Sequence, residues 1–259
     1  MAEYPFLSAL VTGASSGIGE AIVHQLGGAR VPTVVVARRA DRLEDLAKRY
    51  PNIEVLAADL NDSAGLRLVE ARIASTDQPI DLVVNNAGFG TTGLFHTLDA
   101  DRLEQEVGLN VQALTRLSHA ALAAMVPRGR GYLLNVSSVA SFQPAPKLAV
   151  YAATKAYVTS LTESLYGEVA GTGVKVTALC PGLTKTEFQS VSSGEVYAAN
   201  YPKVAWLPVD KVAAAGLRDV AKGKVFSVPG ALYKAAVAAT GVTPRAVTRK
   251  LAGLIQRDV

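Results

Sequence analysis

Tyr151 and Lys155 are the two residues of this sequence whose types and spacing most directly suggest chemistry. If the segment is helical, side chains four residues apart lie on the same face of the helix. The lysine ammonium can then stabilise the tyrosine phenolate and lower the pKa of the phenol, which allows proton exchange near neutral pH. By itself the pair is also compatible with a surface contact. Three further features favour chemistry: an early glycine-rich turn, Asn-Asn-Ala-Gly at 85–88, and Ser138.

The glycine-rich turn follows the first apolar run of the chain and has the composition of a phosphate-binding loop. It covers residues 12–19, and a helical pattern begins within it. Its first two glycines allow a tight turn and a close approach of a pyrophosphate to the backbone, and the third allows close packing of helix on sheet. Free amides and the helix dipole then stabilise the phosphate charge. The predicted cofactor-binding residues here are Gly13, Ser15, Ser16, Gly17, Ile18 and Gly19.

The end of the second apolar run indicates which nicotinamide cofactor binds. NAD sites of this kind usually carry Asp or Glu about 20 residues after the turn, where it holds the ribose 2′-hydroxyl. Here that place is taken by Ala37, followed by Arg38 and Arg39. A guanidinium matches the charge and shape of a 2′-phosphate, so we predict NADP(H) in preference to NAD(H). The alternative is that both arginines only solvate the start of a helix.

Two later segments are predicted to contact the rest of the dinucleotide. Asp59 and Leu60 follow the third apolar run, where the carboxylate could accept a hydrogen bond from the adenine amine. Asn86, Ala87 and Gly88 follow the fourth run, and the small residues would let the cofactor lie against the backbone. The asparagines could instead lock adjacent loops, and both roles stay open.

Short β-branched runs alternate with longer amphipathic segments, and this alternation predicts the fold. We expect an α/β doubly wound Rossmann fold, a mostly parallel seven-stranded sheet with helices on both faces. The predicted strands are 7–11, 33–37, 53–57, 82–85, 131–136, 175–179 and 224–228. The predicted helices are 17–26, 42–49, 63–75, 102–125, 150–170 and 210–221, with Asp41 and either Asn61 or Asp62 at cap positions.

The 259 residues suit a single NAD(P)-binding Rossmann domain, because no linker or repeat divides 1–259. Two segments depart from the alternation. One is an irregular stretch at about 183–207, which we expect to be a substrate loop. The other is a tail at about 231–259, predicted as two short helices separated by Gly241 and Pro244. The tail ends in a basic, amphipathic segment, which leaves open weak peripheral contact with a membrane.

Composition argues against several other kinds of protein. No apolar run approaches the roughly 20 residues of a spanning helix and no signal peptide is visible, so a cytoplasmic protein is expected. The single cysteine, Cys180, is predicted to be a buried filler. The three histidines lack metal-ligand spacing, so we expect no metal site. The net charge of +4 comes from scattered basic residues, and no nucleic-acid partner is expected.

Taken together, these features resemble the short-chain dehydrogenase/reductase (SDR) family, in its compact single-domain subclass. The resemblance spans residues 12–186 with the motifs in the expected order. It implies an oxidoreductase that interconverts a carbonyl and a secondary alcohol, and members of the family commonly form homodimers or homotetramers. The matching residues are the turn at 12–19, Asp59, the segment 85–88, Asn110, Ser138, Tyr151, Lys155, Pro181, Gly182, Thr184 and Thr186.

The resemblance also implies a role for each matching residue. Tyr151 would exchange a proton with the substrate oxygen, and Ser138, rather than the neighbouring Ser137, would hydrogen-bond that oxygen. Lys155 would bind the nicotinamide ribose and lower the pKa of Tyr151. Asn110 would position a water that links Lys155 to solvent, unless it is an ordinary helix-surface amide. The nicotinamide would be held by Pro181, Gly182, Thr184, which replaces a commoner apolar residue, and Thr186.

Apolar and aromatic residues near these motifs suggest a hydrophobic substrate pocket, although each could instead belong to the core. A medium-sized apolar ketone, aldehyde or secondary alcohol suits such a pocket better than a small charged metabolite. Two alternatives stay open: a membrane-associated lipid- or steroid-type reductase that uses the basic tail, and a non-catalytic protein that senses NADP. The pocket candidates are Phe89, Ser138, Phe142, Leu148, Phe188, Tyr197 and Trp206.

Overall fold

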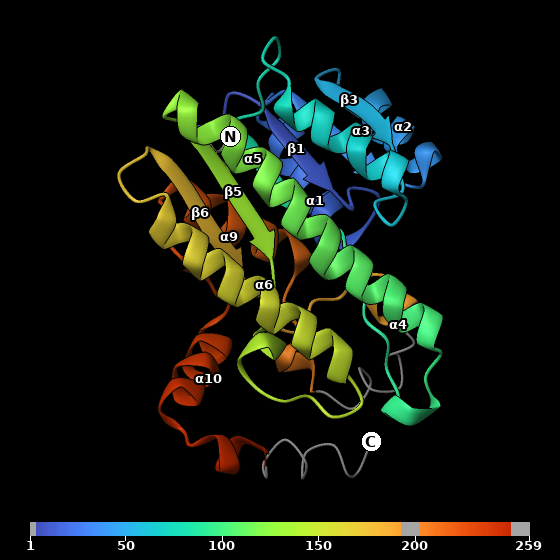
Figure 1. Cartoon of the computed structure of the whole chain (residues 1–259), viewed down its shortest axis with the longest axis vertical. Coiled ribbons are helices and arrows are strands. Elements are labelled where there is room, and N and C mark those ends of the chain that lie inside the picture. The colour runs from blue at the N-terminus through green and yellow to red at the C-terminus, as the bar shows by residue number, and fades with distance from the viewer. Residues whose placement is uncertain (1–3, 193–201, 250–259) are drawn as a thin grey trace.

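Seven parallel strands form one sheet in the computed structural model, which describes residues 4–192 and 202–249. Their order is β3-β2-β1-β4-β5-β6-β7, and the chain winds outward from β1 in both directions (Figure 1). This arrangement confirms the predicted doubly wound fold. The strands are β1 (Ala9–Thr12), β2 (Thr33–Ala37), β3 (Ile53–Ala57), β4 (Leu82–Asn85), β5 (Gly131–Val136), β6 (Val174–Leu179) and β7 (Phe226–Ser227).

Helices cover both faces of the sheet and bury one apolar core on each side. One core contains residues from three helices: α1 (Gly17–Gly28), α2 (Ala40–Arg49) and α9 (Val209–Ala221). The other core includes residues of α3 (Ser63–Ala74), α5 (Leu114–Arg128) and the end of α6 (Ala149–Glu168), which lie in front of the sheet in Figure 1. Because both faces are covered, the central strands β1, β4 and β5 are buried along their whole length.

The prediction of a single helix at 102–125 is wrong in one respect. The segment is helical throughout, but it divides into α4 (Ala100–Val107), a π-helical turn η2 (Gly108–Ala113) and α5. A π-helical turn holds one extra residue, and such turns are frequent at functional sites. Asn110 lies in this turn with its side chain buried, so the prediction of an ordinary helix-surface amide is excluded.

Differences at the element ends have local causes. Strand β1 begins at Ala9 instead of residue 7, because Leu7 is 70% exposed and lies outside the sheet. Asp41 is not a helix cap, since α2 begins at Ala40 and places Asp41 in its first turn. Asp62 does cap α3: its carboxylate accepts hydrogen bonds from the amides of Ala64 and Gly65, at 3.1 and 3.0 Å.

The two ends of the predicted substrate loop lie side by side. Thr184 and Leu207 form an isolated parallel bridge, and the Leu207 amide donates to the Leu183 carbonyl at 2.8 Å. Between them lie α7 (Phe188–Val191) and η4 (Lys203–Ala205). Residues 193–201, which include the pocket candidate Tyr197, lie outside the described part of the chain.

The tail begins with α10 (Ala231–Val242), and residues 245–249 are again helical. Gly241 lies within the last turn of α10, so only Pro244 separates the two helices as predicted. Tyr233 fastens the start of the tail to the loop: its hydroxyl donates to the Ala205 carbonyl at 2.7 Å and accepts from the Leu183 amide at 3.0 Å. The end of the tail beyond residue 249 is outside the described residues.

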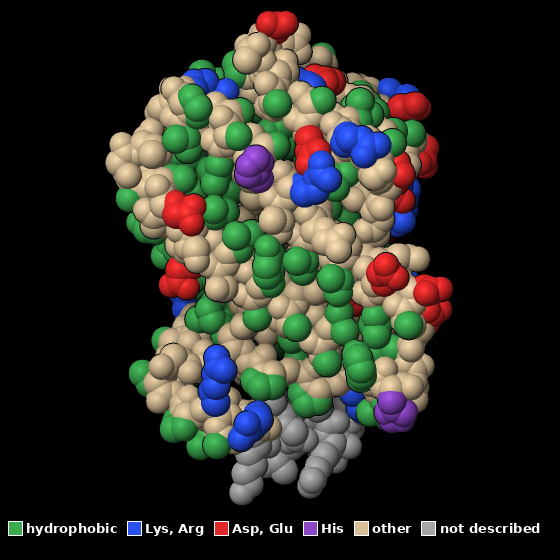
Figure 2. All heavy atoms as spheres, viewed as in Figure 1, with side chains coloured by type: hydrophobic (Ala, Val, Ile, Leu, Met, Phe, Trp, Pro, Cys, Tyr) green, Lys and Arg blue, Asp and Glu red, His purple; other side chains and the backbone are tan. Residues whose placement is uncertain are grey.

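The surface carries charges of both signs. On the face drawn in Figure 2, basic and acidic side chains are interspersed among apolar ones and do not gather into one patch. Across the residues that the structure describes, none of the helices has both the length and the apolar character needed to cross a bilayer.

A substitution at Gly19 tests how tightly α1 packs on the sheet. A methyl group at this position would overlap the Gly13 carbonyl oxygen and crowd the Asn86 amide. We expect Gly19→Ala to lower the free energy of unfolding by about 1–3 kcal/mol, measured by urea denaturation. Gly28→Ala is the matched control, because it lies in the same helix with open space around it and should stabilise by up to about 1 kcal/mol. Equal effects of both variants would contradict the packing argument.

Candidate active site

A cavity of about 630 Å³ lies at the carboxyl edge of the sheet. Because the strands are parallel, the segments that follow β1 to β6 all reach this edge and line the cavity, which spans the point where the strand order reverses. Most of the predicted site residues lie in its wall. They are Gly13, Ser15, Ser16, Gly17, Ile18, Arg38, Arg39, Asp59, Leu60, Asn86, Ala87, Gly88, Phe89, Ser138, Leu148, Tyr151, Lys155, Pro181, Gly182, Thr184, Thr186 and Phe188.

Four predicted residues lie outside the lining. Gly19 packs against the turn behind the cavity, and Asn110 lies in the layer beneath it. Phe142 turns away and packs edge-on against Phe226, with ring centroids 5.9 Å apart. Trp206 is half-buried just before the loop rejoins the Thr184 bridge. The structure therefore does not bring Phe142 and Trp206 to the pocket; Phe142 packs against Phe226 instead.

The glycine-rich turn is held open towards the cavity by the segment after β4. Gly13 and Gly17 have left-handed backbone conformations, with φ of +64° and +61°. The Asn86 Nδ2 donates to the carbonyl oxygens of Thr12 and Gly13, at 3.0 and 3.2 Å. No side chain caps α1 at Ser16, which leaves first-turn amides available to an anion. Asn86 therefore locks the turn and also lines the cavity.

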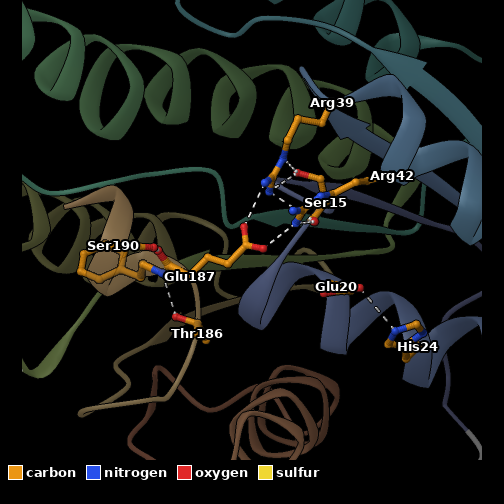
Figure 3. Close-up of polar contacts among 9 residues, drawn as sticks. Ser15, Glu20, His24, Arg39, Arg42, Thr186, Glu187 and Ser190 are labelled. Atoms are coloured by element: carbon orange, nitrogen blue, oxygen red, sulfur yellow. Dashed lines mark hydrogen bonds and ion pairs between the residues drawn. The ribbon is translucent and has the colours of Figure 1, made fainter. Parts of the chain in front are cut away.

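Arg38 and Arg39 line the same end of the cavity, and Arg39 and its neighbour Arg42 turn towards the glycine-rich turn (Figure 3). Arg39 donates to the Ser15 Oγ from Nε at 3.1 Å and from Nη2 at 3.0 Å. Arg42, which the sequence did not single out, donates from Nη1 to the Ser15 carbonyl at 3.3 Å. Arg38 is 73% exposed and lies 3.9 Å from the Asp59 carboxylate. Three guanidinium groups thus lie at or beside this end of the cavity.

The opposite end holds the hydroxyl and amine groups. Tyr151 lies in the first turn of α6 and lines the cavity together with Ser138, which follows β5 and whose hydroxyl is close enough to lower the pKa of the phenol. The neighbouring Ser137 faces away: its hydroxyl donates to the Lys155 carbonyl at 2.9 Å and lies 2.7 Å from the Thr159 hydroxyl. Both serines line the cavity, but the Ser137 hydroxyl is bound to α6, which leaves Ser138 as the serine beside Tyr151.

Burial has the largest effect on the pKa values of Tyr151 and Lys155, and the lowering of the Tyr151 pKa by Lys155 stays a prediction. Burial raises the pKa of the Tyr151 phenol to about 12, the hydrogen bond with Ser138 opposes this, and Glu106 adds to it. Burial also lowers the pKa of Lys155 to about 8. The Lys155 Nζ donates to the Val136 carbonyl at 2.8 Å and lies 5.7 Å from the centre of the Tyr151 ring.

Asn110 fixes the wall behind these groups. Its Oδ1 accepts from the Phe89 amide at 3.1 Å, while its Nδ2 donates to the Phe89 carbonyl at 2.8 Å and to the Thr154 hydroxyl at 3.1 Å. The side chain thus joins the segment after β4 to α6 through the π-helical turn. Its suggested water-positioning role stays a prediction.

Glu106 is a buried acid that the sequence analysis missed. It is fully buried in α4, and neither carboxylate oxygen has a well-formed hydrogen bond. Burial raises its pKa, and the nearby Thr91, Arg102 and Lys155 oppose this only in part. The sequence feature that could have identified Glu106 is its position four residues before Asn110, because this spacing places both residues on the same face of a helix.

Two further lining residues were also missed. Arg102 places its guanidinium 4.8 Å above the Phe89 ring, a cation–π contact at the cavity wall. Tyr233 enters the lining from the tail, which carried no motif that would have pointed to the cavity. Cys180 is fully buried as predicted, and burial raises its thiol pKa to about 12, so it is not an activated nucleophile.

Similarity to known proteins covers most of the chain. Residues 8–195 match the family model for short chain dehydrogenases. An uncharacterised oxidoreductase of Staphylococcus epidermidis is 31% identical over 217 residues, which are 78% of this chain and 94% of that protein. A short-chain dehydrogenase from Sphingobium yanoikuyae in complex with NADPH is 32% identical, with a TM-score of 0.80 over 92% of this chain and 96% of that one. The bulky-bulky ketone specific alcohol dehydrogenase from Comamonas testosteroni is 30% identical, with a TM-score of 0.76 over 92% and 95%.

Glu106 makes stability depend on pH with a defined sign. Its folded-state pKa is raised, so the folded protein binds more protons than the unfolded chain above about pH 4.5, and stability falls as the pH rises through that window. We expect Glu106→Gln to raise the Tm relative to wild type at pH 8 and to change it little near pH 4. Thermal unfolding at both pH values measures this. The control is Glu104→Gln on the exposed face of α4; a Glu106→Gln effect independent of pH would contradict the assignment.

Proposed function

The chain belongs to the short-chain dehydrogenase/reductase family, and we propose that it is an NADP(H)-dependent oxidoreductase that interconverts a carbonyl and a secondary alcohol. The observation that carries this proposal is that Ser138, Tyr151 and Lys155 lie in the wall of the same cavity as the glycine-rich turn. Two hydroxyl groups there can bind one substrate oxygen, and the phenol can exchange a proton with it.

The residues of the cavity fit a dinucleotide cofactor. The turn at Gly13 and Gly17 and the uncapped start of α1 suit the pyrophosphate. Asn86, Ala87 and Gly88 lie between this turn and the Tyr151 end of the cavity, and the last two have small side chains that leave the backbone accessible. When bound, the cofactor supplies or accepts the hydride at the substrate carbon.

Tyr151 acts as the general acid in carbonyl reduction. A phenol with a pKa near 12 keeps its proton at neutral pH, which is the state that a proton donor needs. Ser138 orients the substrate oxygen towards it by a hydrogen bond. Lys155, with a pKa near 8, is mostly protonated at pH 7 and places a positive charge behind the phenol ring, so it favours the phenolate that forms as the proton leaves.

The substrate is a medium-sized apolar carbonyl compound or alcohol. Phe89, Leu148, Phe188 and Val191 line the cavity, and the Phe188 ring lies 5.3 Å from the Tyr151 ring. Apolar walls beside a few polar groups are typical of sites for small organic ligands. The relative that is specific for bulky-bulky ketones supports the same class.

NADP(H) is the preferred cofactor. No carboxylate stands at Ala37 to hold a ribose 2′-hydroxyl, and Arg38 and Arg39 line the cavity beyond it. The NADPH complex of the Sphingobium yanoikuyae relative supports this preference. The cytoplasmic location, the homo-oligomeric state and the weak membrane contact of the tail stay predictions.

Replacement of the Tyr151 hydroxyl tests the proposed chemistry. A panel of ketones, aldehydes and secondary alcohols, followed by nicotinamide absorbance with both cofactors, first identifies a substrate. Tyr151→Phe should then lower kcat by at least about 10²-fold because no proton donor remains, while cofactor binding is retained. Tyr157→Phe is the matched control, since this tyrosine of α6 is 39% exposed and bonds Thr115. Near-normal turnover of Tyr151→Phe would refute the assigned role.

Reversal of charge at Arg38 tests the cofactor assignment. Arg38→Asp places a carboxylate where it repels a 2′-phosphate and can accept from a ribose hydroxyl. We expect kcat/KM with NADPH to fall about tenfold or more relative to NADH, which narrows or inverts the preference. Arg67→Asp, on the exposed surface of α3, controls for net charge. A wild-type preference for NADH would overturn the assignment.

A further inference from the structure

Glu187 joins the loop after β6 to the start of α2. Its Oε1 accepts from Arg42 Nη1 at 2.6 Å, and its Oε2 accepts from Arg39 Nη1 at 2.9 Å (Figure 3). Each carboxylate oxygen therefore contacts a different guanidinium. The partners are 148 and 145 residues apart in sequence, so no local pattern would have paired them.

The same two arginines are also held at the phosphate-binding turn. Arg39 donates to the Ser15 hydroxyl and carbonyl, and Arg42 donates to the Ser15 carbonyl. Ser15, Arg39 and Glu187 all line the cavity. The carboxylate of Glu187 therefore already occupies the two arginines beside the phosphate-binding turn.

The Glu187 carboxylate and a phosphate monoester present the same chemistry to an arginine pair. Both are anions whose oxygen atoms accept charge-assisted hydrogen bonds from guanidinium groups. Hydrogen bonds from Arg42 and Arg39 lower the pKa of Glu187, so the carboxylate is ionised at neutral pH. The two arginine side chains and Glu187 are each about 40% exposed, so a soluble anion can reach them.

We propose that Glu187 competes with the cofactor 2′-phosphate for Arg39 and Arg42, and thereby sets how strongly the protein discriminates NADP(H) from NAD(H). This inference rests on the proposed cofactor preference. A 2′-phosphate carries a charge of about −1.5 to −2 at pH 7 and can displace a single carboxylate. The apparent affinity for the 2′-phosphate is the intrinsic affinity multiplied by the fraction of molecules in which Glu187 does not hold the arginines. A cofactor without that phosphate leaves the Glu187 contacts in place.

The test compares two small probes that differ only in the phosphate. Binding of 2′,5′-ADP and of 5′-AMP is measured by isothermal titration calorimetry for wild type and Glu187→Gln. The variant should bind 2′,5′-ADP roughly 2- to 10-fold more tightly and 5′-AMP with unchanged affinity. Glu70→Gln is the matched control: it breaks a two-bond Glu–Arg pair with Arg116 away from the cavity lining, and it should change neither affinity.

The outcomes separate this inference from the proposed function. If wild type prefers 2′,5′-ADP and Glu187→Gln binds it equally or less tightly, the competition is refuted while the cofactor preference stands. A loss of affinity for both probes would also refute it, because Glu187 would then only support the turn. If wild type shows no preference but the variant gains one, the competition holds and the NADP(H) assignment fails. If neither protein prefers 2′,5′-ADP, both ideas are wrong.

Discussion

The hydrogen bonds between the ends of β1 and β4 hold the site together. The Thr12 hydroxyl accepts from the amides of Asn86 and Ala87, both at 3.0 Å, and the Asn86 side chain returns two bonds to the carbonyls of Thr12 and Gly13. These strands are neighbours at the point where the sheet order reverses. The glycine-rich turn therefore keeps its open shape only while β4 is in register beside β1, and the cavity wall depends on the same contact.

The two ends of the cavity differ because one is buried and the other is exposed. At the inner end, burial shifts the pKa values of Tyr151, Lys155 and Glu106 in the direction that favours the neutral form of each group. At the outer end, Arg39 and Glu187 are partly exposed and remain charged. Proton exchange and phosphate recognition thus take place in surroundings of different polarity, within one cavity.

Much of this arrangement could be predicted from the sequence, because strand ends in a parallel sheet meet at one edge. Four of the seven strands have the predicted bounds, and most of the motif residues between Gly13 and Thr186 line one cavity. Side-chain directions were harder. Phe142 has the composition of a pocket residue, yet it packs against Phe226. Glu106, Glu187 and Tyr233 belong to no motif, and their roles depend on contacts across the fold.

The short segment Thr186–Ser192 connects the two ends of the cavity. Glu187 binds the arginines beside the turn, the next residue, Phe188, packs on Tyr151, and the Ser192 hydroxyl accepts from the Gly90 amide at 3.0 Å. Two adjacent residues at the start of α7, the N-cap Glu187 and Phe188, thus contact the phosphate-binding end and Tyr151. One short segment of the chain therefore forms part of both the arginine end and the Tyr151 end of the cavity.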